Sequence, residues 1–121
     1  MKNLTFDPIV SKCDDLEQYS RRNNIRIVGV PEANEEDTDE LTTALVKRNL
    51  GIEVNKTDIC RSHRLGRKKP GQHRQIIVKF TRHNVKSTIM RKKKILREEG
   101  SNIEIQEDLT QGRLDAIKKL N

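Results

Sequence analysis

The clearest periodic stretch of the chain is residues 74–80, where hydrophobic and polar side chains alternate as they do along a β-strand. One face of this stretch would carry Ile76, Val78 and Phe80, and the other Gln75, Ile77 and Lys79. β-Branched residues fill its centre, and a Pro-Gly pair at residues 70–71 precedes it. The pattern predicts the central strand of a small sheet.

Residues 24–30 form a second alternating stretch, with Ile25 and Ile27 on the face opposite to Arg26. Pro31 follows and lacks the backbone N–H that a continuing strand would donate, so the strand is expected to end before it. Two weaker patterns predict further strands at residues 58–64 and 102–106. The chain is therefore expected to contain four strands.

Apolar residues at three- and four-residue spacing predict helices between and outside these strands. The expected helices are residues 7–20, a segment through residues 41–50 that ends at Gly51, residues 84–98, and a last helix capped by Asp108 or Thr110. In residues 84–98, Ile89 and Leu96 are expected to be buried, with the stem of Lys92 beside them. The residues of this helix expected to face solvent or a ligand are Lys86, Arg91, Lys94 and Arg97.

These elements follow the order helix, then β-α-β-β-α-β, then helix, which predicts an α+β fold of the ferredoxin-like type. In this arrangement the first and third strands lie in the middle of a four-stranded antiparallel sheet, and two helices cover one face. The predicted domains are an N-terminal helix at residues 1–22, a sheet domain at residues 23–107 and a C-terminal helix at residues 108–121. The outward side chains of the central strands would be Arg26, Val28, Gln75, Ile77 and Lys79, a plausible groove for a single nucleic-acid strand.

The N-terminal helix begins favourably at Asp7-Pro8, because Asp is a common N-cap and Pro suits the first helical position. The 3,4 spacing of a coiled coil is followed by Phe6, Ile9, Cys13, Leu16 and Ser20. Two heptads are too short to hold an oligomer by themselves. The segment is therefore either an amphipathic helix packed on the domain or the last turns of an oligomerisation stalk.

The charge of the chain is distributed unevenly. Residues 59–97 contain 14 Lys and Arg residues and no Asp or Glu, whereas the remaining 11 basic residues share the rest of the chain with all 18 acidic residues. A long run of one sign favours a polyanionic partner, and nucleic acid fits it better than a solvated face without a partner. Hydrophobic residues make up 32% of the chain, which is low, but their periodicity argues against a disordered chain.

The sequence shows no arrangement that is typical of an enzyme. Cys60 and His63 have the spacing of half a zinc site, but no second Cys/His pair follows at ligand spacing. A nucleophile with its base and a phosphate-binding glycine loop are also missing. We therefore predict no catalytic residue, no metal site, no cofactor and no small-molecule substrate. Neither a signal peptide nor a transmembrane stretch is visible, so we expect a soluble intracellular protein without a membrane partner.

Four blocks of sequence carry a resemblance to a known family. They are residues 20–32 (SRRNNIRIVGVPE), 63–67 (HRLGR), 74–80 (RQIIVKF) and 107–109 (EDL), and the first is the most specific. Together they resemble the RRM-type domain of the first-open-reading-frame proteins of LINE-type (non-LTR) retrotransposons. The resemblance covers residues 16–120 and implies an RRM below a trimeric coiled coil.

The resemblance implies a cytoplasmic ribonucleoprotein, with the nucleus as a second location, that binds RNA and single-stranded DNA with little sequence preference. It also implies nucleic-acid chaperone activity and a homotrimer formed through an N-terminal coiled coil. Family contacts correspond to Arg22, Asn24, Arg26 and Arg74, and a basic loop to residues 67–69. With the outward cation of the central strand added, the candidate nucleic-acid-binding residues are Arg22, Asn24, Arg26, Arg67, Lys68, Lys69, Arg74 and Lys79.

Several alternatives stay open at this point. Ordinary RRMs stack bases on aromatic side chains, but here Arg26 and Ile77 hold outward central positions, so affinity is expected to come from salt-sensitive phosphate contacts. Asn24 either contacts a ligand or shapes the turn, and residues 67–69 contact phosphate or form a nuclear localisation patch. The run at residues 92–94 is interpreted as a solvated helix face. The competing function is a protein-interaction module derived from such an element, with the basic face incidental.

Overall fold

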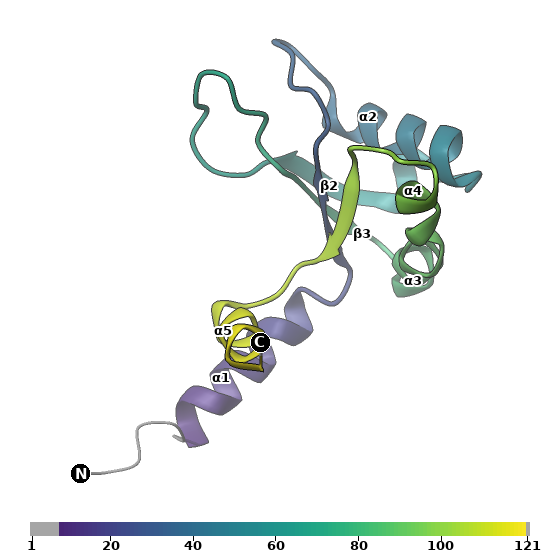
Figure 1. Cartoon of the computed structure of the whole chain (residues 1–121). Helices are drawn as coiled ribbons and strands as arrows, with labels where there is room; N and C mark the ends of the chain where they lie inside the picture. Colours follow the sequence, from purple (N-terminus) through teal and green to yellow (C-terminus); the bar gives the residue numbers. More distant parts are fainter. Residues whose placement is uncertain (1–7, 121) are drawn as a thin grey trace. The chain divides into compact units, whose positions relative to one another are not determined.

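The computed structural model of the protein describes residues 8–120. Two compact units make up the chain. The smaller unit contains α1 (Pro8–Ser20) and α5 (Gln111–Leu120), and the larger unit is residues 23–107 (Figure 1). The two ends of the chain therefore belong to one unit, and the segment between them forms the other.

The larger unit is an α+β structure built on a four-stranded antiparallel sheet, as the sequence predicts. Its elements in chain order are β1 (Asn24–Val28), α2 (Thr38–Leu45), the π-helical turn η1 (Val46–Leu50), the 3-10 turn η2 (Lys56–Asp58), β2 (Ile59–Arg64), β3 (Ile76–Phe80), α3 (His83–Lys92), α4 (Lys94–Glu98) and β4 (Glu104–Glu107). The strands lie in the order β2-β3-β1-β4, which places β1 and β3 in the middle. This arrangement is compatible with a ferredoxin-like fold.

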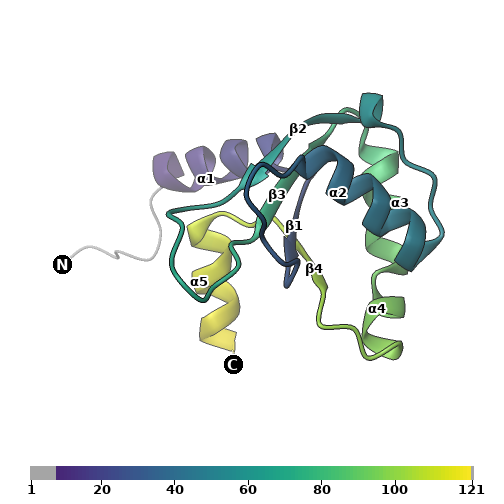
Figure 2. The same ribbon diagram turned by 90° about the horizontal axis from the view of Figure 1, so that it is seen from above.

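The hydrophobic core of this unit lies between one face of the sheet and the helices. Ile25 and Ile27 of β1 and Val78 of β3 expose none of their surface, because alternation along paired strands directs them to the same face. Ile89 of α3 and Leu96 of α4 pack against them from the other side. Figures 1 and 2 show α2, α3 and α4 gathered on this one side of the sheet.

Strand β1 ends two residues earlier than the alternation predicts, because Gly29 turns the backbone. Its φ angle is +95°, in the region that side chains with a Cβ rarely adopt. A Cβ here would also lie 2.3 Å from the carbonyl oxygen of Asn102, in the segment before β4. Gly29 therefore ends the strand and permits a close approach of two backbone segments.

The predicted helix at residues 84–98 is two helices, α3 and α4, with a break at Lys93. The prediction that Lys92 lies beside the buried residues is wrong, because its side chain is exposed. Lys86, expected to face solvent or a ligand, is instead the buried lysine, and its ammonium group pairs with the carboxylate of Glu107. Lys86 and Ile89 are three residues apart and share the buried face of α3, and this face ends at the break.

The smaller unit is held by polar contacts between the end of α1 and the start of α5. The side chain of Gln18 donates to the carbonyl oxygen of Asp108 at 3.1 Å and accepts from the N–H of Thr110 at 2.9 Å. Arg21 pairs with the buried Asp108 at 3.3 Å, and Thr110 caps α5 through the N–H of Arg113 at 3.2 Å. Of the two caps that the sequence offers for this helix, the structure uses Thr110.

The predicted coiled-coil positions are described only in part. Asp7, its proposed N-cap, and Phe6 lie outside the described residues, as do the side chains of Ile9 and Cys13. Leu16 is 62% exposed in the smaller unit. Assembly through this helix therefore stays a prediction.

Candidate nucleic-acid interface

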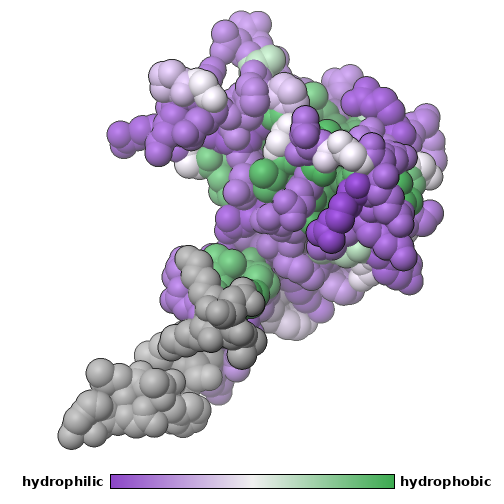
Figure 3. All heavy atoms as spheres, in the orientation of Figure 1, coloured by the Kyte–Doolittle hydropathy of each residue, from purple (hydrophilic) through white to green (hydrophobic). Residues whose placement is uncertain are grey.

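The second face of the sheet carries mostly polar and charged side chains from all four strands. They are Arg61 and His63 on β2, Ile77 and Lys79 on β3, Asn24, Arg26 and Val28 on β1, and Gln106 and Glu104 on β4. We call this surface the open face, because α2, α3 and α4 all lie on the other side of the sheet (Figure 2). Hydrophilic residues also dominate the surface of the larger unit that Figure 3 shows.

A β-bulge at Cys60 directs Arg61 to the open face. Ile59 pairs with Phe80 and is buried, whereas Arg61 pairs with Lys79, so two steps along β2 match one step along β3. If Cys60 paired as an ordinary strand residue instead, Ile59 and Arg61 would point the same way, because side chains alternate along a strand with a period of two. The bulge thus turns Arg61 outward and returns Arg64 to the buried side.

Arg61 and Lys79 lie directly opposite each other on the open face. Like charges in this position repel each other and destabilise a sheet. Neither side chain makes an ion pair with a carboxylate among residues 8–120. A small hollow of about 50 Å³ lies at this point, and its lining residues are Asn24, Arg61, His63, Ile77 and Lys79. The structure therefore brings two of the predicted site residues, Asn24 and Lys79, together with two polar residues, Arg61 and His63, that the prediction did not include.

The charge of the open face changes across the sheet. Arg26 of β1 is half-buried and lies between Ile77 of β3 and Gln106 of β4. Glu104 of β4 lies opposite Val28 and is exposed. Cations therefore occupy β2, β3 and the middle of β1, whereas the β4 edge carries a carboxylate. A bound polyanion would lie over β2, β3 and β1 rather than over β4.

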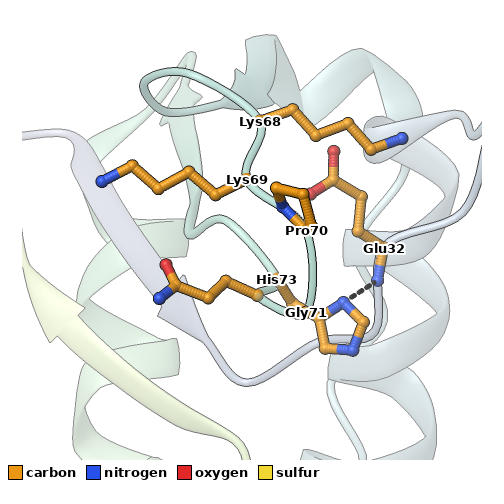
Figure 4. A pocket seen from close by; sticks show the side chains of 7 residues that line it. Glu32, Lys68, Lys69, Pro70, Gly71 and His73 are labelled. Atoms are coloured by element: carbon orange, nitrogen blue, oxygen red, sulfur yellow. Dashed lines mark hydrogen bonds between the residues drawn. The ribbon is translucent and has the colours of Figure 1, made fainter.

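The predicted basic loop connects β2 to β3. Arg67, Lys68 and Lys69 are all exposed, and the Nζ of Lys68 donates to the side-chain oxygen of Asn34 at 2.9 Å. Beside this loop is a hollow of about 520 Å³ lined by Glu32 and residues 68–73. Figure 4 shows that the side chains of Lys68 and Lys69 extend from this hollow in different directions. The loop presents cations to solvent but does not gather them around one point.

Arg74, a predicted contact, is committed largely to a carboxylate within the protein. Its Nε donates to both oxygens of Glu32, at 3.1 and 3.3 Å, and its Nη2 donates at 2.5 Å. Its Nη1 donates to the carbonyl oxygen of Gly66 at 2.9 Å. The hydrogen bonds from Arg74 lower the pKa of Glu32 from its ordinary 4.5 to about 2, and the carboxylate raises the pKa of Arg74. The geometry makes Arg74 a residue that fixes the loop.

A second arginine–carboxylate pair lies next to the first. The guanidinium of Arg64 donates to the two oxygens of Glu36 at 2.7 and 2.9 Å. Its other N–H groups reach the backbone oxygens of Val30, Pro31 and Arg74, at 2.9, 3.0 and 2.6 Å. The hydrogen bonds from Arg64 lower the pKa of Glu36. We call these four side chains, Glu32, Glu36, Arg64 and Arg74, the loop clamp, because they join the loop after β1 to the loop between β2 and β3.

His73 adds a further contact to the same two loops. Its Nδ1 accepts a hydrogen bond from the backbone N–H of Glu32 at 3.0 Å, which Figure 4 marks. An accepting Nδ1 carries no hydrogen, so the tautomer that makes this contact has its hydrogen on Nε2. The hollow beside the loop is therefore bounded by chain segments that are fixed to each other.

Arg22 belongs to the smaller unit and not to the sheet. Its guanidinium carbon lies 4.3 Å from the centre of the Tyr19 ring, a cation–π contact within one turn of chain. It is exposed. Of the eight predicted residues, the open face therefore holds Asn24, Arg26 and Lys79, while the loop between β2 and β3 holds residues 67–69 and leads to Arg74.

Sequence reasoning missed Arg61 and His63 as members of the open face. The signal that could have placed them is weak, because the strand that contains them alternates poorly until the bulge at Cys60 is allowed for. Reasoning also missed Arg64 as a buried residue, although its side chain is only 3% exposed. The block HRLGR carries part of the resemblance, but nothing local in it indicates that Arg64 has a carboxylate partner 28 residues away.

Other kinds of site find little support in the described residues. No group of three or more His, Cys, Asp or Glu side chains between residues 8 and 120 is arranged to hold a metal ion. Cys60 is a free and exposed thiol. None of the helices in the same range combines the length and hydrophobicity that a membrane crossing requires.

Comparison with protein-family models and with curated protein sequences finds no match for this chain.

Proposed function

We propose that the protein binds single-stranded RNA or DNA across the open face of its sheet, mainly through the phosphate backbone. The observation that carries this proposal is the juxtaposition of Arg61 and Lys79 without a carboxylate partner among residues 8–120. A phosphate between the two would turn a repulsive pair into two charge-assisted hydrogen bonds. Asn24 and His63 line the same hollow and can donate to a phosphate or a base edge.

Little sequence preference is expected from this surface. RRM-type sheets gain base contacts from aromatic rings on the two central strands, each stacked base contributing about 1–3 kcal/mol. Here Phe80 is buried and Tyr19 lies in the smaller unit, so no Phe, Tyr or Trp side chain among the described residues faces outward from the sheet. Phosphate contacts carry no sequence information and weaken with salt. The open face therefore suits a non-specific binder with a steep salt dependence.

The resemblance to the RRM-type domain of LINE-type retrotransposon proteins gives this proposal a biological setting. An α+β unit with an antiparallel sheet is what that resemblance implies for the fold. We extend the proposal to a ribonucleoprotein role in the cytoplasm or nucleus, with chaperone activity on nucleic acids and trimerisation through α1. The sheet carries the binding in this proposal, and the smaller unit carries the assembly.

Fluorescence anisotropy of labelled single-stranded RNA, single-stranded DNA and duplex DNA at several salt concentrations tests the binding. Tight single-strand binding that weakens steeply with salt is expected for the full chain. Replacing both Arg61 and Lys79 with Ala removes two phosphate contacts, so the slope of log K against log salt should fall by roughly 1.4, or about 0.7 per contact. Binding with the same slope in this variant would move the site off the sheet, and no binding at low salt would refute the proposal.

A protein-interaction function is favoured by one observation in the smaller unit. Large apolar side chains are exposed there, namely Leu16, Tyr19, Leu114 and Ile117. If this surface is the functional one, sedimentation should show self-association while the anisotropy assay shows no binding. Single-strand binding by a monomer would favour the open face instead.

A further inference from the structure

The structure contains a second basic surface, which includes α4 and the end of α3, away from the open face. Five cations lie within seven residues there, namely Arg91, Lys92, Lys93, Lys94 and Arg97. None of them makes an ion pair with a described carboxylate. Several cations elsewhere in the larger unit are paired, such as Lys56 with Asp37 at 3.0 Å and Arg82 with Asp58 at 3.3 Å. Charge left uncompensated in one place marks a surface that suits an external anion.

Three of these five cations border a hollow, and the other two do not. The hollow measures about 390 Å³ and lies between α4 and the turn that leads into β4. Its lining residues are Lys93, Lys94, Leu96, Arg97 and residues 100–105. Glu104 is the one acidic residue of this lining, against three cations, and its place in β4 directs its side chain to the open face. The lining therefore keeps a positive charge, in contrast to a solvated helix face of mixed sign.

The groups around the hollow are placed by the backbone. The Nζ of Lys93 donates to the carbonyl oxygen of Ile105 at 3.3 Å, which directs this side chain from the helix toward β4. The turn opposite is shaped by Gly100 at φ +71° and by Ser101, whose Oγ accepts from the N–H of Ile103 at 3.0 Å. Lys94 and Arg97 are exposed at the rim. Ammonium and guanidinium groups around a polar turn match the oxygen atoms of a phosphodiester.

We propose that this hollow is a second binding site for a phosphodiester backbone, and that the larger unit can hold two segments of nucleic acid. The inference rests on the proposed function, because the first segment lies on the open face. α3 and α4 cover the opposite side of the sheet, as Figures 1 and 2 show, so the two surfaces are not one continuous groove. A protein with two such surfaces brings two strands, or two parts of one strand, close together.

The test uses the full chain and two matched double variants. Lys94→Ala/Arg97→Ala removes two exposed cations from the rim of the hollow, and Arg91→Ala/Lys92→Ala removes two exposed cations that do not line it. Both pairs lower the net charge equally. Titration with a short labelled single strand, followed by a second strand carrying a different label, reports the two binding events separately. Circular dichroism and thermal melts check that both variants fold as the wild type does.

The wild type is expected to bind two short strands and to give energy transfer between the two labels. Lys94→Ala/Arg97→Ala should weaken the second event roughly tenfold, as expected for two exposed charge contacts, and abolish the transfer signal at matched concentrations. Arg91→Ala/Lys92→Ala should lower the logarithm of the affinity for the second strand by less than half as much as Lys94→Ala/Arg97→Ala does. Equal losses in the two pairs would overturn the site and leave a diffuse charge effect. A first event without a second would refute this inference alone, whereas no binding at all would refute the proposed function as well.

Discussion

The open face and the loop clamp use cations in opposite ways. In the loop clamp, Arg64 and Arg74 each meet a carboxylate through two or more hydrogen bonds, and backbone oxygens take further donors. On the open face, Arg61 and Lys79 face each other. All four residues fall within the same one-sign block of residues 59–97. Charge density along the sequence therefore does not distinguish cations that stabilise the fold from cations that are available to a ligand.

The distinction depends on partners that come from far away in the chain. Both carboxylates of the loop clamp lie in the acidic segment after β1, 28 and 42 residues from their arginines. Such bidentate pairs with low exposure hold loops in place and leave few donors for a ligand. The following substitutions test this division, beginning with the largest expected effect.

Replacing Arg64 with Ala should cause the largest loss of stability. Its side chain is 3% exposed, so the change leaves Glu36 and three backbone oxygens without their donor. Breaking a buried pair in this way costs roughly 3–5 kcal/mol of unfolding free energy. Urea denaturation measures the loss. Arg61→Ala is the control at an exposed site and should change stability by less than about 0.5 kcal/mol; equal losses in the two variants would erase the distinction.

Replacing both Arg61 and Lys79 with Ala should raise stability slightly while it weakens binding. The removal of a directly opposed like-charge pair relieves repulsion of about 0.2–1 kcal/mol. A higher free energy of unfolding in urea, together with a lower nucleic-acid affinity by anisotropy, would show that these cations serve a ligand rather than the fold. A stability loss beyond about 1 kcal/mol would instead assign them a structural role.

Replacing Arg74 with Ala should separate two interpretations of a predicted contact. The geometry assigns it to Glu32 and Gly66, so the variant should loosen the loop between β2 and β3 and lower stability. Its salt slope for nucleic-acid binding should stay close to that of the wild type. Faster hydrogen exchange in residues 65–75 measures the loosening. A salt slope that falls by about 0.7, with unchanged hydrogen exchange in residues 65–75, would instead show that Arg74 contacts a phosphate.

Acid should weaken the loop clamp gradually. The folded-state pKa of Glu32 is about 2 and its ordinary pKa is 4.5, so the pair contributes its full stability above pH 4.5. That contribution declines as pH falls toward 2, because the unfolded chain, in which Glu32 has the higher pKa, takes up the proton first. The pKa of Glu36 is lowered too, which gives the same sign. Thermal melts from pH 6 to pH 2 should show a flatter profile for Glu32→Gln than for wild type; parallel profiles would contradict the assignment.

Local pattern predicted β1 and β3 because each alternates between core and surface over its own length. Ile25, Ile27, Val78 and Phe80 are buried as expected, and Gly51 ends the helical segment at φ +68°. The helix at residues 84–98 was predicted less well, because the break at Lys93 is not visible in the spacing of apolar residues. Lys86 is buried and Lys92 is exposed, which is the reverse of the prediction.

The candidate site was harder to predict because it depends on register and on distant partners. Sequence placed Lys79 and Arg26 outward correctly, since both lie in clean alternating strands. It could not show that Arg61 faces Lys79, which requires the pairing of β2 with β3. Nor could it show that Arg74 is held by Glu32, because no local rule links residues that are 42 positions apart.

Both regions depend on the bulge at Cys60, although Cys60 belongs to neither. This one extra residue shifts the alternation of β2 by one position. The odd-numbered Ile59 points to the core before it, and the even-numbered Arg64 points to the core after it. If Cys60 paired as an ordinary strand residue, without the bulge, Arg61 would turn inward and Arg64 outward, so that the binding surface and the loop clamp would be lost together. Deletion of Cys60 would instead keep both, because Ile59 and Arg61 would then be consecutive residues on opposite faces of a regular strand.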